Sequence, residues 1–258
     1  MGSSKEEASF LRHALGSLCI ATMLLLGVLL LPLLLAFRKI RELFFVAFFR
    51  LVMVIWSEEF CGCRRQALEP LQSLQSHDPK LREQGAIRVL EIGAGLGGNF
   101  PHITRPIKYT NVDPNEEFGS SFLKELRRNP KIELEQWIKG YGENMSDLPS
   151  GHFDVVMFSY LLCSAKDSRK VLEEVKRVLV KGGSLVFLEH VGFPHGTWQR
   201  LVQNAVTPLW KVTCCNCHLN RDSVKQIEDA GFSHVTARYI DLHMTVLLRR
   251  QAYGTAVL

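Results

Sequence analysis

The seven cysteines of this sequence include no two C-x-x-C knuckles that could pair, and their spacing is irregular. Zinc sites built from cysteine usually take their ligands from two such knuckles, so we expect no metal. The alternative is a zinc site at Cys214, Cys215, Cys217 and His218, with Cys61 and Cys63 as further ligands. An odd cysteine count is also unlike the disulfide framework of a small secreted domain. The pattern indicates free thiols in a reducing compartment.

The sequence also lacks a concentrated basic stripe, although its net charge is +5. A nucleic-acid-binding protein more often gathers lysine and arginine on one segment with aromatic residues between them. No N-P-P-(F/Y/W) motif follows the apolar segment FDVV at residues 153–156. We therefore expect no nucleic-acid partner.

Charge is absent from residues 14–37, a run of apolar and small residues. As a helix this run would be about 36 Å long, enough to cross a hydrocarbon core of about 30 Å. It has no clear A-x-A cleavage site, so we predict an uncleaved anchor. Arg38, Lys39 and Arg41 follow it, which favours a cytosolic location for the rest of the chain. Pro32 leaves open a re-entrant hairpin in place of a span.

A second apolar stretch at residues 43–56 is too short to span a membrane and contains Arg50. Its aromatic residues suit a helix in the membrane interface, so we expect residues 14–56 to contact lipids. The alternative is a buried helix of the folded domain. The predicted organisation is an anchor at 1–37, an interfacial helix and connector at 38–84, and a folded domain at 85–258.

The folded domain alternates strand and helix patterns, and the strands are expected at 87–92, 108–112, 132–138, 153–161, 184–190, 234–240 and 252–258. Between them, a helix capped by Asp167 should end at Gly182 and Gly183. Repeated β-α-β units predict an α/β fold with a doubly wound, mostly parallel, seven-stranded sheet. Ligands of such folds lie beyond the carboxyl ends of the strands.

The sequence RVLEIGAGLGGNF carries the pattern G-x-G-x-x-G at Gly93, Gly95 and Gly98, after a strand and before an expected helix. Small residues allow the backbone to approach a ligand, and helix amides can bind it. Asp113 follows the next strand, where a carboxylate can accept hydrogen bonds from ribose hydroxyls. These signals do not separate a nicotinamide dinucleotide from S-adenosylmethionine.

The ordered series VLEIGAGLGGNF, NVDPN, GYGENM, FDVVMFSYLLCS and RVLVKGGSLVFLEH resembles class I S-adenosylmethionine-dependent methyltransferases, a Rossmann-like fold. The resemblance implies S-adenosylmethionine as cofactor. It implies binding roles for Glu91, Gly93, Ala94, Gly95, Asp113, Pro114, Asn115, Gly142, Glu143, Asn144, Ser159 and Tyr160. Many relatives have Asp where this chain has Tyr141, and Pro where it has Lys181.

A further set of features resembles the methyltransferase-like 7 family of thiol S-methyltransferases. It comprises the N-terminal anchor, the connector, N-F at residues 99–100, D-P-N at 113–115, L-C-S at 162–164, L-E-H-V at 188–191 and CHLNRDS at 217–223. That resemblance implies methylation of small lipophilic alkyl thiols at the cytosolic face of the endoplasmic reticulum or lipid droplets. The thiol substrate is implied by this resemblance alone.

His190 is the candidate base for the acceptor thiol, because it ends a strand at the expected cleft and histidine titrates near neutral pH. Glu189 is the candidate residue to orient it. The alternative is a packed histidine at a strand end. Other functions remain open at this point: a lipid or quinone C- or O-methyltransferase, an NAD-dependent oxidoreductase, or a non-catalytic protein that recruits partners to lipid droplets.

Overall fold

The computed structural model describes residues 2–258, apart from the side chains of residues 2–10 and 12. The chain forms two compact units built from separated segments. The first contains the described residues up to Cys63, with His190–Asp222 and Tyr239–Gln251. The second contains Arg64–Glu189, Ser223–Arg238 and Ala252–Leu258. The expected ranges 1–37, 38–84 and 85–258 divide the chain along the sequence, and they stay a prediction.

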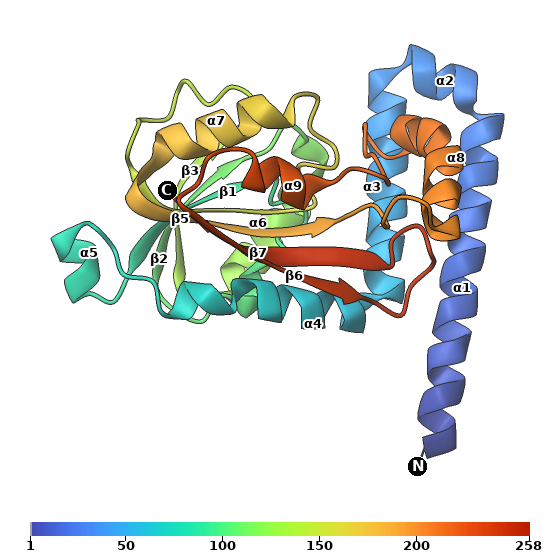
Figure 1. Ribbon diagram of the computed structural model, residues 1–258, viewed down its shortest axis with the longest axis horizontal. Helices are drawn as coiled ribbons and strands as arrows, with labels where there is room; N and C mark the ends of the chain where they lie inside the picture. The colour runs from blue at the N-terminus through green and yellow to red at the C-terminus, as the bar shows by residue number, and fades with distance from the viewer. Residues whose placement is uncertain (1) are drawn as a thin grey trace. The chain divides into compact units, whose positions relative to one another are not determined.

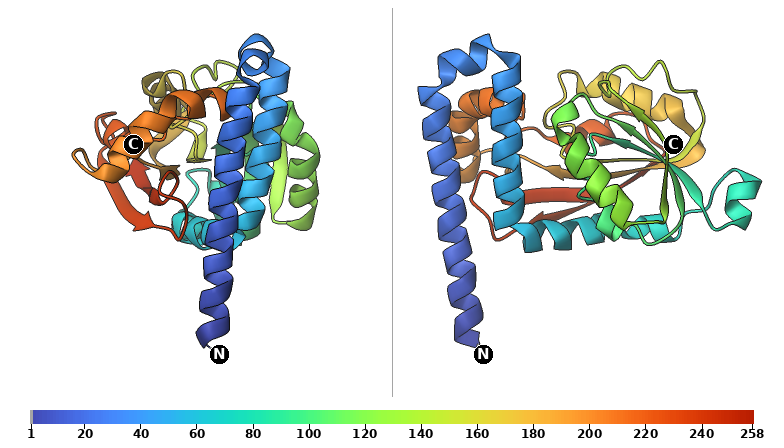
Figure 2. Two further views of the ribbon diagram at one scale, coloured as in Figure 1. Left: turned by 90° about the vertical axis from the view of Figure 1, so that its right-hand side faces the viewer. Right: turned by 180° about the vertical axis from the view of Figure 1, so that it is seen from behind.

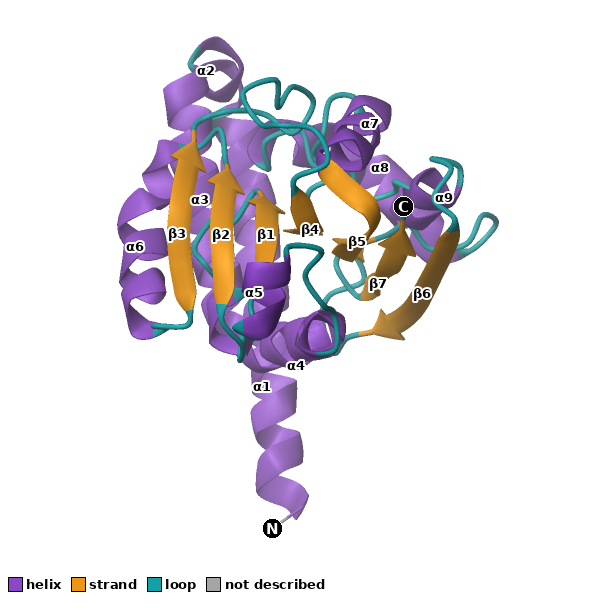
Figure 3. Ribbon diagram, turned by 90° about the vertical axis from the view of Figure 1, so that its left-hand side faces the viewer, coloured by secondary structure: helices purple, strands orange, loops and turns teal. Residues whose placement is uncertain are grey.

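One seven-stranded sheet has the order β3-β2-β1-β4-β5-β7-β6 (Figures 1 and 3). The strands are β1 (Ile87–Ile92), β2 (Ile107–Val112), β3 (Ile132–Ile138), β4 (Phe153–Ser159), β5 (Leu179–His190), β6 (His234–Asp241) and β7 (Arg250–Val257). The strand order reverses between β1 and β4, so the ends of these two strands form a topological switch point.

Strands β1 to β5 pair in parallel. Strand β7 runs antiparallel to β5. The amide of Val191, at the end of β5, donates to the carbonyl of Arg250, where β7 begins, and the amide of Leu258, after the end of β7, donates to the carbonyl of Gly183, near the start of β5. Strands β1 and β4 are mostly apolar and are buried along nearly their whole length, as parallel strands covered on both faces must be. The predicted mostly parallel α/β sheet is confirmed.

Helices α6 (Gly119–Arg128) and α7 (Ser168–Val178) belong to the second unit. Phe122 of α6 packs on Phe100 and Tyr109 at one face of the sheet, with ring centroids 5.1 Å and 6.3 Å away. Helix α7 presents the apolar stripe of the predicted helix, which is fully buried, and the Asp167 side chain caps it by accepting from the amide of Lys170. The short helix α9 (Ser223–Glu228) lies next to α7.

Two local expectations are wrong. The glycine turn is followed by the 3-10 turn η2 (Phe100–His102) in place of an α-helix, because Pro101 lacks an amide hydrogen and Pro106 precedes the next strand. Strand β5 begins at Leu179, before Gly182 and Gly183, since these glycines pair with Leu258 at the chain end. Neither difference moves the carboxyl ends of β1, β2 and β4.

The connector is mostly helical, with α4 (Ser57–Leu68), η1 (Glu69–Gln72) and α5 (Pro79–Glu83). Asp154, at the start of β4, holds it to the sheet. This buried carboxylate accepts from the Ser76 hydroxyl (2.7 Å), from the amide of His77 (2.7 Å) and from the amide of Arg88 (2.8 Å). Both oxygens of one carboxylate thus bind the connector at residues 76–77 and β1 at Arg88, so the connector enters the sheet at a defined position.

The first unit contains α1 (Gly2–Leu29), α2 (Leu31–Ala36), α3 (Arg38–Ile55) and α8 (Trp198–Thr213). Helices α1 and α3 run side by side in opposite directions and α2 joins them (Figure 2). The apolar run at residues 14–37 is therefore split between α1 and α2. The chain turns first at Leu30, where Pro32 cannot continue the hydrogen-bond pattern of α1, and turns again at Phe37, whose backbone is extended.

Close packing in the first unit depends on glycine. A Cβ at Gly16 would lie 2.0 Å from the Trp56 ring, and one at Gly27 would lie 2.4 Å from Thr213 of α8. Helix α3 buries Val46, Phe48 and Val52, and the Phe48 ring meets Trp210 edge-on at 5.8 Å. Residues 43–56 thus have one buried face, as in the alternative of a packed helix.

Across residues 2–258, no helix has both the length and the apolar character needed to cross a membrane. The expected transmembrane anchor at residues 14–37 is therefore unconfirmed.

Candidate active site

Most of the predicted cofactor residues lie at the carboxyl ends of three neighbouring strands. Glu91 is on β1 and is followed by the glycine turn, Asp113 follows β2, and Ser159 ends β4. These strands are adjacent and parallel in the order β2-β1-β4, so their ends meet at one edge of the sheet. The structure brings together Glu91, Gly93, Ala94, Gly95, Asp113, Pro114, Asn115 and Ser159.

The glycine turn is held open by backbone conformations that favour glycine. Gly93 and Gly95 have φ angles of +77° and +54°. The Gly95 amide donates to Asp113 Oδ2 at 3.0 Å, and the Ala94 amide donates to Asn111 Oδ1 at 3.3 Å. These hydrogen bonds connect the loop after β1 to the end of β2, so the conformation of the turn is fixed by the neighbouring strand.

Asp113 is 6% exposed, and its second oxygen accepts from the amide of Asn115 at 2.8 Å. Burial raises the pKa of the Asp113 carboxyl, while the amides of Asn115 and Gly95 oppose this rise. A carboxylate has about four acceptor positions, so the two amides leave capacity for two more donors. Vicinal hydroxyls of a ribose supply such a pair.

Glu91 is almost fully buried and belongs to a polar cluster beside the turn. Its Oε1 accepts from Asn99 Nδ2 at 2.7 Å, and its Oε2 accepts from the Tyr109 hydroxyl. The same Asn99 amide donates to Ser159 Oγ at 3.0 Å. Burial raises the pKa of the Glu91 carboxyl to about 7, and the bonds from Tyr109 and Asn99 and the charge of Arg64 oppose the rise.

Asn99 therefore links the ends of β1 and β4, a role that the sequence patterns do not assign. The one signal for it is N-F directly after the glycine turn, at residues 99–100. A second missed residue is Arg64 of α4, whose guanidinium carbon lies 5.9 Å from the Tyr160 ring centroid. Nothing in its spacing along the chain relates it to the turn.

The loop after β3 holds the predicted adenine residues. A Cβ at the buried Gly142 would lie 3.0 Å from Ile92 and 3.5 Å from Val171 of α7. The Glu143 carboxylate accepts from the amide of Lys166 at 2.8 Å, and Asn144 accepts from Ser146 at 3.3 Å. Gly142 thus lies against the end of β1, whereas the side chains of Glu143 and Asn144 organise neighbouring turns.

Tyr160, directly after β4, has a φ of +62°, which is strained for an aromatic residue. Glu189 supports the turn that follows. This fully buried carboxylate accepts from the amides of Leu161 (2.6 Å), Leu162 (2.8 Å) and Cys163 (3.1 Å), and from Ser223 Oγ at 3.3 Å. In the structure, Glu189 therefore stabilises the loop that follows Tyr160. Its role in orienting His190 stays a prediction.

His190 belongs to the first unit and contacts Cys217. Its Nε2 lies 3.0 Å from Cys217 Sγ, and the indole Nε1 of Trp210 donates to the same sulfur at 3.3 Å. All three side chains are buried. Cys217 is delivered by a loop in which Cys215 and Asn216 have φ angles of +47° and +69°. The pairing of the histidine with a thiol was not expected.

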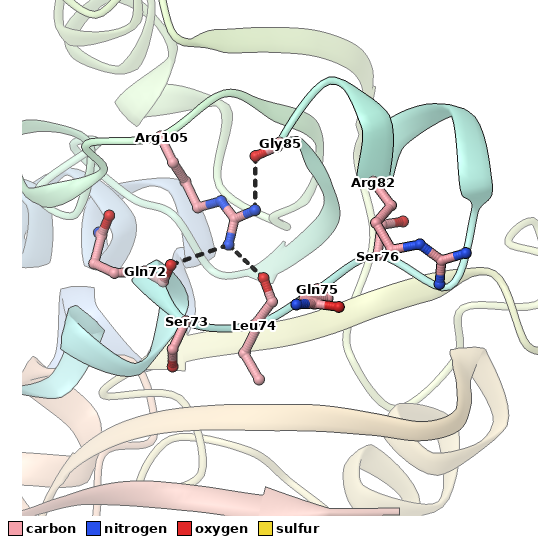
Figure 4. Close-up of a pocket in the computed structure, with 8 residues that line it drawn as sticks. All are labelled: Gln72, Ser73, Leu74, Gln75, Ser76, Arg82, Gly85 and Arg105. Atoms are coloured by element: carbon pink, nitrogen blue, oxygen red, sulfur yellow. Dashed lines mark hydrogen bonds between the residues drawn. The ribbon is translucent and has the colours of Figure 1, made fainter.

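A pocket of about 300 Å³ lies at the opposite end of the sheet, where β1 and β2 begin (Figure 4). Arg105 lines it and donates to the carbonyls of Leu71 (2.8 Å) and Gly85 (2.6 Å). Figure 4 shows this guanidinium directed at the backbone carbonyls of Gln72, Leu74 and Gly85. Because ligands of doubly wound sheets bind beyond the carboxyl ends of the strands, we assign Arg105 a structural role.

The residues of the glycine-turn site fit S-adenosylmethionine. The turn glycines with positive φ have no side chain that would block a ligand next to the backbone. There is open space beside Gly95, because a Cβ added there would meet only Phe118, at 4.0 Å. Asp113 has acceptor capacity for the ribose, and Glu91 lies next to the turn. The polar groups match the nucleoside and amino-acid parts of this cofactor.

Comparison with known proteins agrees with this geometry. A family model described as a methyltransferase domain matches residues 90–187. Human thiol S-methyltransferase TMT1A is 33% identical over 205 residues, which cover 79% of this chain and 82% of the human protein. Thiol S-methyltransferase TMT1B of Rattus norvegicus is 43% identical over 149 residues, or 58% of this chain and 61% of the rat protein.

Among solved structures, an S-adenosylmethionine-dependent methyltransferase of Thermotoga maritima, described as a possible histamine N-methyltransferase, superposes with a TM-score of 0.56. It is 18% identical and the match covers 83% of this chain and 98% of that structure, a likeness of fold. Sheet order, glycine turn and matched domain define the protein as a class I S-adenosylmethionine-dependent methyltransferase. Within that class, the chain belongs to the thiol S-methyltransferase family of TMT1A and TMT1B, the methyltransferase-like 7 family.

Proposed function

We propose that this protein transfers the methyl group of S-adenosylmethionine to the sulfur of small lipophilic thiols, at the cytosolic face of the endoplasmic reticulum or of lipid droplets. The observation that carries the proposal is the similarity to human TMT1A over 82% of its length, combined with the intact Asp113 and glycine turn. TMT1A and TMT1B are both described as thiol S-methyltransferases.

The residues of the site bind and orient more than they react. When bound, S-adenosylmethionine supplies a methyl group already activated by its sulfonium. Asp113 would bind the ribose hydroxyls. Because the turn glycines have no side chain, the backbone of the turn could approach the cofactor closely. Positioning of a nucleophile can account for much of the rate acceleration in such a transfer.

The acceptor thiol must lose its proton, because the thiolate is the nucleophile and a free thiol has a pKa of about 8.5. We propose His190 as the base. Its imidazole is buried and already bonds to a sulfur atom, that of Cys217, at 3.0 Å. The Trp210 indole donates to this sulfur, so the Cys217 S–H can point at His190 Nε2.

Membrane attachment is supported by exposed apolar side chains in the first unit. Helix α1 buries one stripe through Gly16, Ile20, Met23 and Gly27, yet Leu18, Leu25 and Leu29 on its other side are between 59% and 66% exposed. Trp198 and Leu201 of α8 are similarly exposed. Exposed leucine and tryptophan side chains grouped on helices in this way are typical of a surface that contacts lipid or a partner. The basic residues at 38, 39 and 41 suit an anionic membrane surface.

The proposal is tested by transfer of a labelled methyl group from S-adenosylmethionine to a small alkyl thiol, with the full-length protein in lipid vesicles. Wild-type protein is expected to methylate the thiol. Asp113→Ala should lower kcat/KM by about ten- to a hundredfold, because the lost hydrogen bonds to a charged group contribute about 1.5–3 kcal/mol.

Asp147→Ala is the matched control, since Asp147 is an exposed carboxylate in the loop after β3. It should leave kcat/KM unchanged. Binding of the cofactor without any methylation of thiols, and methylation of lipid or quinone acceptors in parallel assays, would contradict the thiol as substrate while keeping the methyltransferase class.

A further inference from the structure

Arg64 of α4 belongs to the same compact unit as the glycine turn, although it precedes the range predicted for the folded domain. Its guanidinium lies against Gly98. A Cβ built on Gly98 would be 2.9 Å from Arg64 Cζ and 2.9 Å from Nη1. The guanidinium carbon is also 5.9 Å from the Tyr160 ring centroid. Arg64 therefore lies beside the loops that follow β1 and β4, the two strands at the topological switch point.

The charge of Arg64 acts on the interior of the site. Burial raises the pKa of Glu91, and the charge of Arg64 opposes that rise. Burial also lowers the pKa of His102, and Arg64 adds to that lowering. A positive guanidinium and the Glu91 carboxyl thus flank one glycine turn. The methionine end of S-adenosylmethionine carries an α-ammonium and an α-carboxylate, so it needs one group of each sign.

We propose that Arg64 binds the α-carboxylate of the methionine part of S-adenosylmethionine. This inference rests on the proposed function and adds a cofactor residue from outside the matched methyltransferase domain at 90–187. Guanidinium suits the task because its planar fork can donate two parallel hydrogen bonds to a carboxylate. Contact with Gly98 and the Tyr160 ring limits where that fork can lie.

The test is calorimetric binding of two ligands to the full-length protein: S-adenosylmethionine and its decarboxylated analogue, which keeps the adenosine, the sulfonium and the amine. Arg64→Ala should weaken binding of S-adenosylmethionine by about ten- to a hundredfold. The same variant should change the affinity for the decarboxylated analogue by less than about twofold, since that ligand has no carboxylate to lose.

Arg65→Ala is the matched control, because Arg65 is the next residue of α4 and is exposed. It should leave both affinities unchanged. Arg64→Lys keeps the charge without the fork and is expected to show a smaller loss for S-adenosylmethionine alone. If thermal unfolding shows that Arg64→Ala is misfolded, Gly98→Ala takes its place, since its added methyl group displaces the guanidinium without removing it.

Equal weakening of both ligands, or no weakening of either, would overturn the inference. Failure of wild-type protein to bind either ligand would overturn the proposed function itself, which is a different result. The inference is supported if Arg64→Ala weakens binding of S-adenosylmethionine and leaves binding of the decarboxylated analogue nearly unchanged. The same result with Gly98→Ala supports it if Arg64→Ala is misfolded.

Discussion

Single residues at the carboxyl ends of β1 and β4 combine structural and chemical work. Asn99 connects Glu91 with Ser159, and Tyr160 holds a left-handed backbone conformation with a φ of +62°. Glu189 receives three consecutive amides of the following turn. Strain at Tyr160 is sustained because these bonds define the turn independently of the tyrosine.

The buried Glu91 carboxyl should make stability depend on pH. Its folded pKa of about 7 is above the unfolded value of 4.5, so the folded state binds more protons between these values. The free energy of unfolding should therefore fall as pH rises from about 4.5 to 7, by on the order of 3 kcal/mol, and level off above. Urea unfolding of wild type and Glu91→Gln at pH 5 to 8 measures this.

In Glu91→Gln the side chain has the same size and shape but does not titrate, so the free energy of unfolding of this variant should fall less between pH 4.5 and 7. Other titrating groups are common to both proteins and cancel in the difference. Parallel pH profiles for the two proteins would show that Glu91 does not titrate there.

At the scale of elements, glycine decides how closely helices approach. Gly16 of α1 faces the Trp56 ring, whereas a Cβ added at Gly62 of α4 would have no neighbouring atom within 4 Å. Both are helical, so replacement by alanine gains about 1 kcal/mol of helix propensity at each. The two sites differ only in the space available for the new methyl group.

Gly62→Ala should therefore stabilise the protein by about 0.5–1 kcal/mol. Gly16→Ala should destabilise it by about 1–3 kcal/mol, because a Cβ 2.0 Å from the Trp56 ring forces the helix or the indole to move. Thermal or urea unfolding, with Trp fluorescence as probe, distinguishes the two. Stabilisation by both substitutions would contradict the close packing of α1 on Trp56.

At the scale of the whole molecule, the exposed apolar helices of the first unit are expected to hold the protein on lipid. Replacing Leu18, Leu25 and Leu29 of α1 together by asparagine removes three exposed leucines, each of which gains up to about 2 kcal/mol on burial in hydrocarbon. Flotation with phospholipid vesicles should show at least a tenfold loss of bound protein.

Tyr141→Asn serves as the control for flotation, because Tyr141 is an exposed aromatic residue of the second unit, 46% exposed. It should float like wild type. Undiminished flotation of the triple variant would show that α1 is not the membrane contact.

Local sequence determined much of this protein. Mostly apolar segments of six or seven residues predict the buried parallel strands, because both faces of such strands are covered. Gly93, Gly95 and Asp113 were identifiable because a strand, a turn and a carboxylate follow one another along the chain at fixed spacing. Pro32 also marked the break between α1 and α2 as one of two alternatives.

The tertiary structure alone decided which distant residues meet. Arg64 reaches Gly98 and Cys217 reaches His190 through packing of separated segments, and no periodic pattern records such contacts. Glu189 was expected beside a catalytic histidine, yet its carboxylate holds the amides of residues 161–163 on the neighbouring strand's loop. A side chain's partners depend on strand order and register, which are long-range properties, whereas its secondary structure follows from its neighbours along the chain.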